Sequence, residues 1–152
     1  MVYHLLPPTT KKAAHHTSNQ VNQNIRDKTV CTINTNKEKS KFILSDKIQE
    51  LNYEWDTERV LETNAASVIL FSSIMGLINK KRYWFLLIGT VGFFLLQHAL
   101  QGWCPPLPVI RKLGVRTADE INNEKIIYKL LRQDFSMNTN DTSKLLNMAE
   151  KQ

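Results

Sequence analysis

The sequence predicts an all-α membrane protein: a two-span transmembrane helical hairpin with flanking amphipathic helices and a disordered N-terminal tail. Three observations predict this class. An apolar block almost free of charge lies in the middle of the 152-residue chain, a short basic turn divides it, and polar sequence flanks it. The averages of 42% hydrophobic residues and net charge +6 hide this division, because they combine a polar first third with the apolar block.

Residues 1–44 are rich in Thr, Asn, Lys, Gln and Ser and contain few large apolar side chains. Burial of so little apolar surface does not offset the entropy lost on ordering a chain, so we expect a disordered polar tail. The pairs Lys11-Lys12 and His15-His16 are not interleaved with aromatic residues or further ligands. We therefore expect neither nucleic-acid binding nor a metal site in this tail.

A connecting amphipathic helix is predicted over residues 45–58. Ser45 is suited to cap its N-terminus, and Ile48, Leu51 and Trp55 follow at spacings of three and four, which forms one apolar stripe. This helix leads into the membrane.

The hairpin is predicted over residues 59–104, with spans at about 60–78 and 84–103. Residues 65–78 carry no charge but supply only about 21 Å of helix, and adding residues 60–64 extends the first span to about 28 Å. The second span carries no formal charge and reaches about 30 Å, the thickness of the hydrocarbon. Tyr83, Trp84 and Trp103 mark its ends, as interface anchors do.

Only residues 79–82 separate the two spans, so the helices must run antiparallel and touch. Ser72 and Gly76 on the first span, and Gly89 and Gly92 on the second, are predicted to let the backbones approach. Because a hairpin alone buries little surface, we expect a homodimer or a larger membrane partner.

The distribution of basic residues sets the expected orientation. The turn holds three, whereas the two flanks hold five: Lys47, Arg59, Arg111, Lys112 and Arg116. Both termini are therefore expected to face the cytoplasm.

A Pro-rich turn and an interfacial amphipathic helix are predicted over residues 105–135. The prolines at 105, 106 and 108 end the second span. Thr117 and Glu120 fit a capping box for a helix over about 118–133. Its apolar face is expected to rest on the membrane surface or on a partner, and residues 136–152 are expected to be a flexible tail.

The runs WDTERVLETNAA, LLQHALQGWCPPLPVIRKLGVRT and EINNEKIIYKLLRQDF together resemble the YgaP-like transmembrane domain family of small bacterial inner-membrane proteins. The resemblance covers about residues 55–135, and its most specific part is Gly102-Trp103-Cys104-Pro105 followed by Leu113-Gly114 and Thr117. It implies the hairpin, the bacterial inner membrane and cytoplasmic termini. Some members carry a rhodanese domain before the hairpin; the polar tail here is too short for one, so sulfur transfer by such a domain is not carried over.

Cys104 is the strongest candidate for a reactive residue. It lies at the water boundary, and Arg111 and Lys112 are close enough in sequence to favour a thiolate. The alternative is a small residue that packs the turn before Pro105. His98 is an intramembrane polar residue, and we expect it to contact Gln97, Gln101, a head group or Asn64 of the first span, which should lie at a similar depth.

No motif of catalysis, phosphate binding, metal binding or cofactor binding is present in the sequence. We therefore expect no catalytic residue, cofactor, metal or small-molecule substrate, and the lipid bilayer as the principal partner. The expected function is a structural or accessory role in a membrane assembly. The alternative is a membrane-boundary thiol or sulfur carrier that acts through Cys104.

Overall fold

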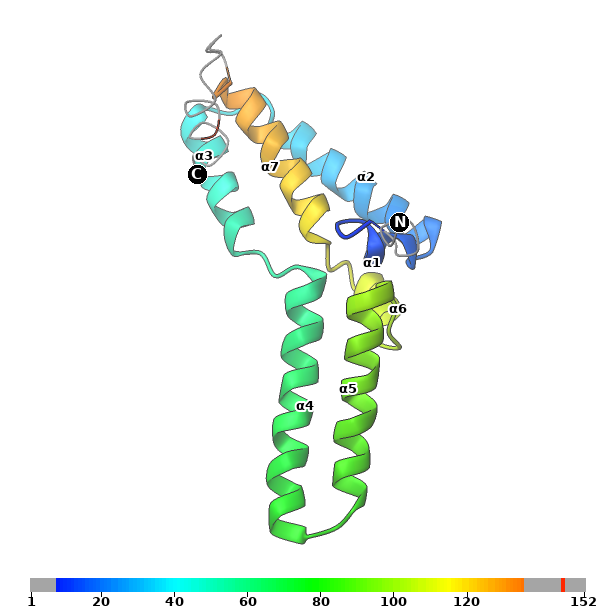
Figure 1. The fold of residues 1–152 in the computed structure, drawn as a ribbon. Coiled ribbons are helices and arrows are strands. Elements are labelled where there is room, and N and C mark those ends of the chain that lie inside the picture. Colours follow the sequence, from blue (N-terminus) through cyan, green and yellow to red (C-terminus); the bar gives the residue numbers. More distant parts are fainter. Residues whose placement is uncertain (1–7, 136–145, 147–152) are drawn as a thin grey trace. The chain divides into compact units, whose positions relative to one another are not determined.

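The structure, a computed structural model, describes residues 8–135 and Leu146 (Figure 1). All regular elements of the described residues are α-helices, which confirms the all-α class; they are α1 (Lys12–His15), α2 (Asn19–Asn36), α3 (Lys41–Tyr53), α4 (Thr57–Asn79), α5 (Tyr83–Gln101), α6 (Leu107–Lys112) and α7 (Ala118–Arg132). The chain divides into a first unit, up to residue 23 together with 55–118, and a second unit, 24–54 together with 119 onward. The predicted flexible segment 136–152 lies outside the described residues except for Leu146.

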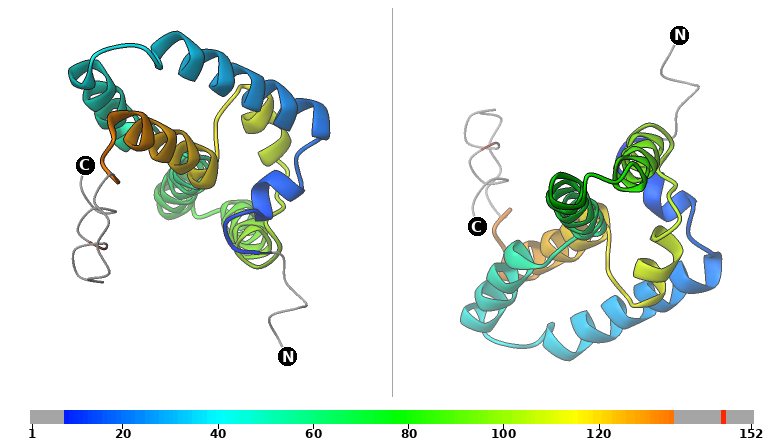
Figure 2. Two further views of the ribbon diagram at one scale, coloured as in Figure 1. Left: turned by 90° about the horizontal axis from the view of Figure 1, so that it is seen from above. Right: turned by 90° about the horizontal axis from the view of Figure 1, so that it is seen from below.

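The helices α4 and α5 of the first unit form the hairpin and lie side by side in Figures 1 and 2. The α4 helix begins after Asp56, whose carboxylate accepts a hydrogen bond of 2.8 Å from the backbone N–H of Arg59. It ends at Lys80, which has a left-handed φ of 52° and donates its N–H to the Gly76 carbonyl at 2.9 Å. This C-cap turns the chain into the short connection to α5.

Close packing at the turn end of the hairpin depends on Gly76. A Cβ at this position would lie 3.3 Å from Cβ of Trp84, and Ser72, one helical turn earlier, is also buried. The Trp84 ring packs edge-on against Phe71, with 6.0 Å between the ring centroids. Glycine at position 76 therefore allows α5 to start close against α4.

The predicted packing role of Gly89 and Gly92 within the hairpin is wrong. A Cβ built on either glycine meets no atom of residues 8–135 within 4 Å. Both glycines leave open space on α5, so they do nothing to bring α4 closer. Two glycines three residues apart on an apolar helix carry no information about which neighbour they face.

The outer faces of α4 and α5 carry large apolar side chains that no other part of the described chain covers. They include Leu70, Phe71, Ile74, Leu77, Ile78, Phe85, Leu86, Phe93, Leu96 and Leu100. Two helical stretches, one ending at Asn79 and the other Tyr83–Gln101, are long and apolar enough to cross a membrane. An apolar surface of this extent in water would be very unfavourable, whereas hydrocarbon accommodates it.

The predicted disordered tail is largely helical in the structure, since α1, α2 and the start of α3 lie within residues 8–44. We expected the many Thr and Asn residues of this segment to favour disorder, but their side chains donate hydrogen bonds to backbone carbonyls. Thr17 donates to the Ala13 carbonyl at 2.8 Å, and Asn22 donates to the Ala14 carbonyl at 2.9 Å. The buried apolar residues of this segment, such as Ala13, Ile25 and Leu44, are far apart in the sequence. They form no helical periodicity that would predict this packing.

Arg111 holds the N-terminal segment within the first unit. Its side chain is fully buried, and its guanidinium donates to Thr17 Oγ1 at 3.2 Å, to Asn22 Oδ1 at 2.9 Å and to the Val115 carbonyl at 2.9 Å. Nearby, Ala13 packs in a core cluster with Leu61, Cys104, Leu107 and Ile110. Residues 8–22 are therefore an integral part of this unit.

The second unit has its own core, in which Ile121 and Tyr128 of α7 pack with Leu44, Ile48 and Leu51 of α3. The Ser45 hydroxyl lies within α3, where it donates to the Lys41 carbonyl, so the predicted cap at Ser45 is wrong and Ser40 is the N-cap residue. The α7 face that we expected to rest on the membrane or a partner is thus covered in part by the chain itself.

Candidate functional site

Polar and thiol side chains converge where α4 begins and α5 ends. Glu58 lies in the first turn of α4, His98 in the last turn of α5, and Cys104 three residues after α5. Gly102 makes this possible, because its left-handed φ of 80° reverses the chain, and its N–H bonds to the His98 carbonyl at 2.7 Å. Cys104 then returns toward the end of α5.

A hydrogen bond joins the two ends of the hairpin: His98 Nε2 lies 2.9 Å from Glu58 Oε2. The other carboxylate oxygen, Glu58 Oε1, lies 3.6 Å from Nζ of Lys12 in α1. Because an ionised carboxylate only accepts hydrogen bonds, Nε2 must carry the proton that it donates to Glu58. Nδ1 is therefore the imidazole nitrogen that can accept a proton from a neighbouring group.

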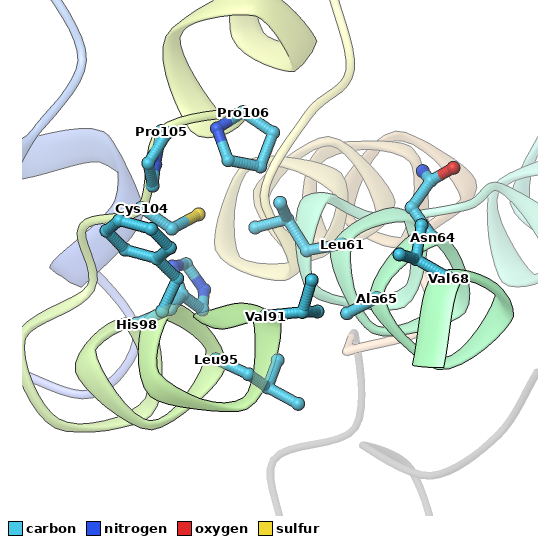
Figure 3. Close-up of a pocket in the computed structure, with 11 residues that line it drawn as sticks. Leu61, Asn64, Ala65, Val68, Val91, Leu95, His98, Cys104, Pro105 and Pro106 are labelled. Atoms are coloured by element: carbon cyan, nitrogen blue, oxygen red, sulfur yellow. The ribbon is translucent and has the colours of Figure 1, made fainter. Parts of the chain in front are cut away.

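The Nδ1 atom of His98 is buried and makes no hydrogen bond within the described part of the chain. The Cys104 thiol lies beside the same ring and interacts with it (Figure 3). Both side chains are almost fully buried, with exposed fractions of 3% for His98 and 4% for Cys104. A thiol, an imidazole and a carboxylate in this order are the arrangement in which a base accepts a thiol proton and an acid orients the base.

A pocket of about 450 Å³ borders the thiol and the imidazole (Figure 3). Its walls are mainly apolar side chains of α4 and α5: Leu61, Ala65, Val68, Val91, Phe94 and Leu95. Pro105 and Pro106 bound it beside Cys104, and Asn64 lines it from α4. The site therefore combines an apolar cavity with a small polar end.

Asn64 does not bond to His98, so the predicted contact between them is wrong. Its amide donates to the Val60 carbonyl of its own helix at 2.8 Å, while Glu58 occupies Nε2 of the histidine. Both Asn64 and His98 nevertheless line the same pocket, at comparable depth along the hairpin. The longer Glu side chain reaches across from the first turn of α4.

The Arg111 guanidinium donates hydrogen bonds to Thr17, Asn22 and the Val115 carbonyl, and its expected effect on the Cys104 thiol stays a prediction. The His98 imidazole is a basic neighbour of the thiol that the sequence analysis did not pair with it. Cys104 and Cys31 are both free thiols, the first buried and the second exposed.

The three predicted interface anchors differ in their surroundings. Tyr83 has an exposed fraction of 52% and Trp103 of 36%. The Trp84 ring packs edge-on against Phe71, and its indole N–H is buried without a hydrogen bond among the described residues. Within residues 8–135, no group of three His, Cys, Asp or Glu side chains is positioned to hold a metal ion.

Sequence reasoning missed Glu58 and Lys12 as members of the site. Glu58 could have been predicted as a partner of His98. It lies at the entrance of the first span, on the side of the membrane where the second span ends. An intramembrane histidine near that boundary calls for an acceptor at the same end of the facing helix. Lys12 gave no such signal because it lies in a segment without periodicity.

The family described as inner membrane protein YgaP-like, transmembrane domain, matches residues 56–120. A comparison with curated proteins and with solved structures finds no match to the chain. The matched residues comprise the whole hairpin, the Gly102–Pro105 element and the segment that returns to the start of α4. The apolar outer faces of α4 and α5 and this match together make the protein an integral membrane protein, whose residues 56–120 match the model of the YgaP-like transmembrane domain.

Proposed function

We propose that the protein is a membrane-boundary thiol or sulfur carrier that acts through Cys104. One observation carries the proposal: the Cys104 thiol, the His98 imidazole and the Glu58 carboxylate follow one another at the end of an apolar pocket. A structural role for Cys104 alone would require only a small apolar side chain at this position. The neighbouring imidazole gives the thiol a proton acceptor, because its Nδ1 atom is buried and has no hydrogen bond within the part of the chain that the structure describes.

The chemistry of such a carrier follows from the three groups. The Cys104 thiol gives its proton to Nδ1 of His98, and Glu58 stabilises the resulting imidazolium through Nε2. The thiolate attacks the outer sulfur of a donor persulfide, so a new S–S bond forms at Cys104 while the S–S bond of the donor breaks. The donor leaves as a thiolate and takes the proton from the imidazolium. The protein then holds the sulfur as a carrier and is not itself an enzyme.

The proposal predicts that His98 accelerates alkylation of Cys104. In membrane vesicles, with Cys31→Ser to remove the exposed thiol, His98→Ala is expected to slow alkylation by N-ethylmaleimide by about tenfold or more at neutral pH. Glu58→Gln should give a smaller decrease, because the imidazole stays but loses its orienting charge. The measurement is the initial labelling rate from pH 5 to 9.

His16→Ala is the matched control, since His16 is exposed and lies outside the site. It should leave the rate unchanged. Equal rates for the wild type and His98→Ala would exclude the proton-accepting role and with it the carrier function.

We further propose that the protein resides in the bacterial inner membrane with both termini in the cytoplasm. The family description supports the inner membrane. The excess of basic residues supports the orientation, with three in the turn and five on the flanks. Cys104 would then lie at the cytoplasmic boundary.

A structural or accessory role in a membrane assembly is the second candidate, supported by the open space at Gly89 on the outer face of α5. A helix of a second copy or of another membrane protein could approach closely there. We expect Gly89→Leu to abolish a cross-linked dimer in native membranes, because the side chain would fill this space. Gly76→Leu should disturb the hairpin itself, since a Cβ there already lies 3.3 Å from Trp84. Recovery of monomer alone from the wild type would remove this candidate.

A further inference from the structure

We infer that the pocket between α4 and α5 binds a single alkyl chain with a small polar head, which enters from the bilayer and places its head at His98 and Cys104. The inference goes beyond the proposed thiol function, because it concerns the molecule that occupies the pocket and not the sulfur donor. The binding step itself needs only the pocket and the imidazole.

The walls of the pocket select an apolar occupant. Ala65 and Val68 line it from α4, and Val91, Phe94 and Leu95 line it from α5. These side chains offer no hydrogen bonds, so a charged or strongly polar ligand would lose its hydration without compensation. The volume of about 450 Å³ lies within the range of about 300–1,000 Å³ that is usual for small-molecule pockets.

The polar end of the pocket requires a hydrogen-bonding partner. His98 is 97% buried, and its Nδ1 atom has no hydrogen bond among the described residues, although buried polar atoms are nearly always satisfied. Its Nε2 atom is occupied by Glu58. A hydroxyl head on the ligand would donate a hydrogen bond to Nδ1, and it would lie next to the Cys104 thiol.

The position of the pocket determines where the ligand comes from. Both helices that form its walls are membrane-spanning, and their outer faces are apolar. A molecule dissolved in the hydrocarbon can therefore reach the pocket from within the bilayer, while the exposed residues Pro105 and Pro106 border its polar end beside Cys104. This favours a lipid-derived chain over a soluble metabolite.

The test compares two alkylating reagents with the same head, N-ethylmaleimide and N-dodecylmaleimide, on the full Cys31→Ser chain in vesicles. Ala65→Phe fills the pocket, and we expect it to slow labelling of Cys104 by the dodecyl reagent by about tenfold while the ethyl reagent changes by less than about twofold. Ala66→Phe is the matched control, because Ala66 is exposed and does not line the pocket. It should leave both rates unchanged.

A second measurement avoids the risk that Ala65→Phe misfolds. In the wild-type chain, 1-dodecanol should protect Cys104 from N-ethylmaleimide, while exposed Cys31 serves as the internal control and stays equally reactive. Equal slowing of both reagents by Ala65→Phe, or no protection of Cys104 by 1-dodecanol, would overturn the inference. The proposed thiol function is judged separately, by the effect of His98→Ala on labelling with the ethyl reagent.

Discussion

Replacing Arg111 by methionine is expected to release residues 8–22 from the first unit. The substitution removes the buried guanidinium that donates to Thr17, Asn22 and the Val115 carbonyl. Because hydrogen bonds to a charged group contribute about 1.5–3 kcal/mol each, and the freed oxygens can rebond in part, we expect a loss of about 3 kcal/mol. Trypsin cleavage after Lys12 in lipid nanodiscs should then accelerate about a hundredfold.

Lys112→Met is the control for this prediction, because Lys112 is the exposed neighbour of Arg111 and loses the same charge. Its cleavage rate should match that of the wild type. If Arg111→Met were as resistant as Lys112→Met, the buried guanidinium would not be what holds the N-terminal segment in place.

Gly102→Ala is expected to have the second large effect, since two separate costs act at this residue. The left-handed φ of 80° costs an alanine about 1–2 kcal/mol. In addition, the new Cβ would lie 2.5 Å from Lys12 Cβ and 2.8 Å from the main-chain carbonyl carbon of Lys12. The backbone of α1 must therefore move, and cleavage after Lys12 should accelerate by about tenfold or more.

Gly114→Ala separates the two costs. Gly114 has a similar φ of 89°, but a Cβ there would meet no atom of the described residues within 4 Å. It shares the backbone strain without the clash, so we expect little change in cleavage after Lys12. Equal acceleration in the two variants would mean that backbone strain alone, and not the close approach of α1, accounts for the requirement for glycine at position 102.

The hairpin was predictable from sequence because its signal is strong and local. An uncharged apolar run of about 20 residues with aromatic residues at its ends is typical of a transmembrane span. Four residues between two apolar runs leave only the antiparallel arrangement. The helical ends agree closely with the predicted spans. The role of Gly76 in the turn also follows from its small size, whereas that of Gly102 depends on α1, which the sequence did not reveal.

The N-terminal helices and the complete site were not predictable in the same way. Helices α1 to α3 gain their order from contacts that are distant in sequence, such as those of Arg111 with Thr17 and Asn22, and propensity does not contain this information. If residues are counted outward from the turn, His98 comes opposite Asn64. The Asn64 amide, however, donates to the carbonyl one turn earlier in its own helix. Glu58 then becomes the partner through the greater reach of its side chain.

The start and the end of the membrane domain meet at one point. The Thr57 N–H donates to the Arg116 carbonyl at 2.8 Å, and the Thr57 hydroxyl donates to the same oxygen at 2.9 Å, while Thr57 is fully buried. Residues 57–116 therefore form a loop whose two ends adjoin. A segment with adjoining ends can be added to very different proteins without a linker across the bilayer, so this domain is suited by geometry to serve as a portable membrane module.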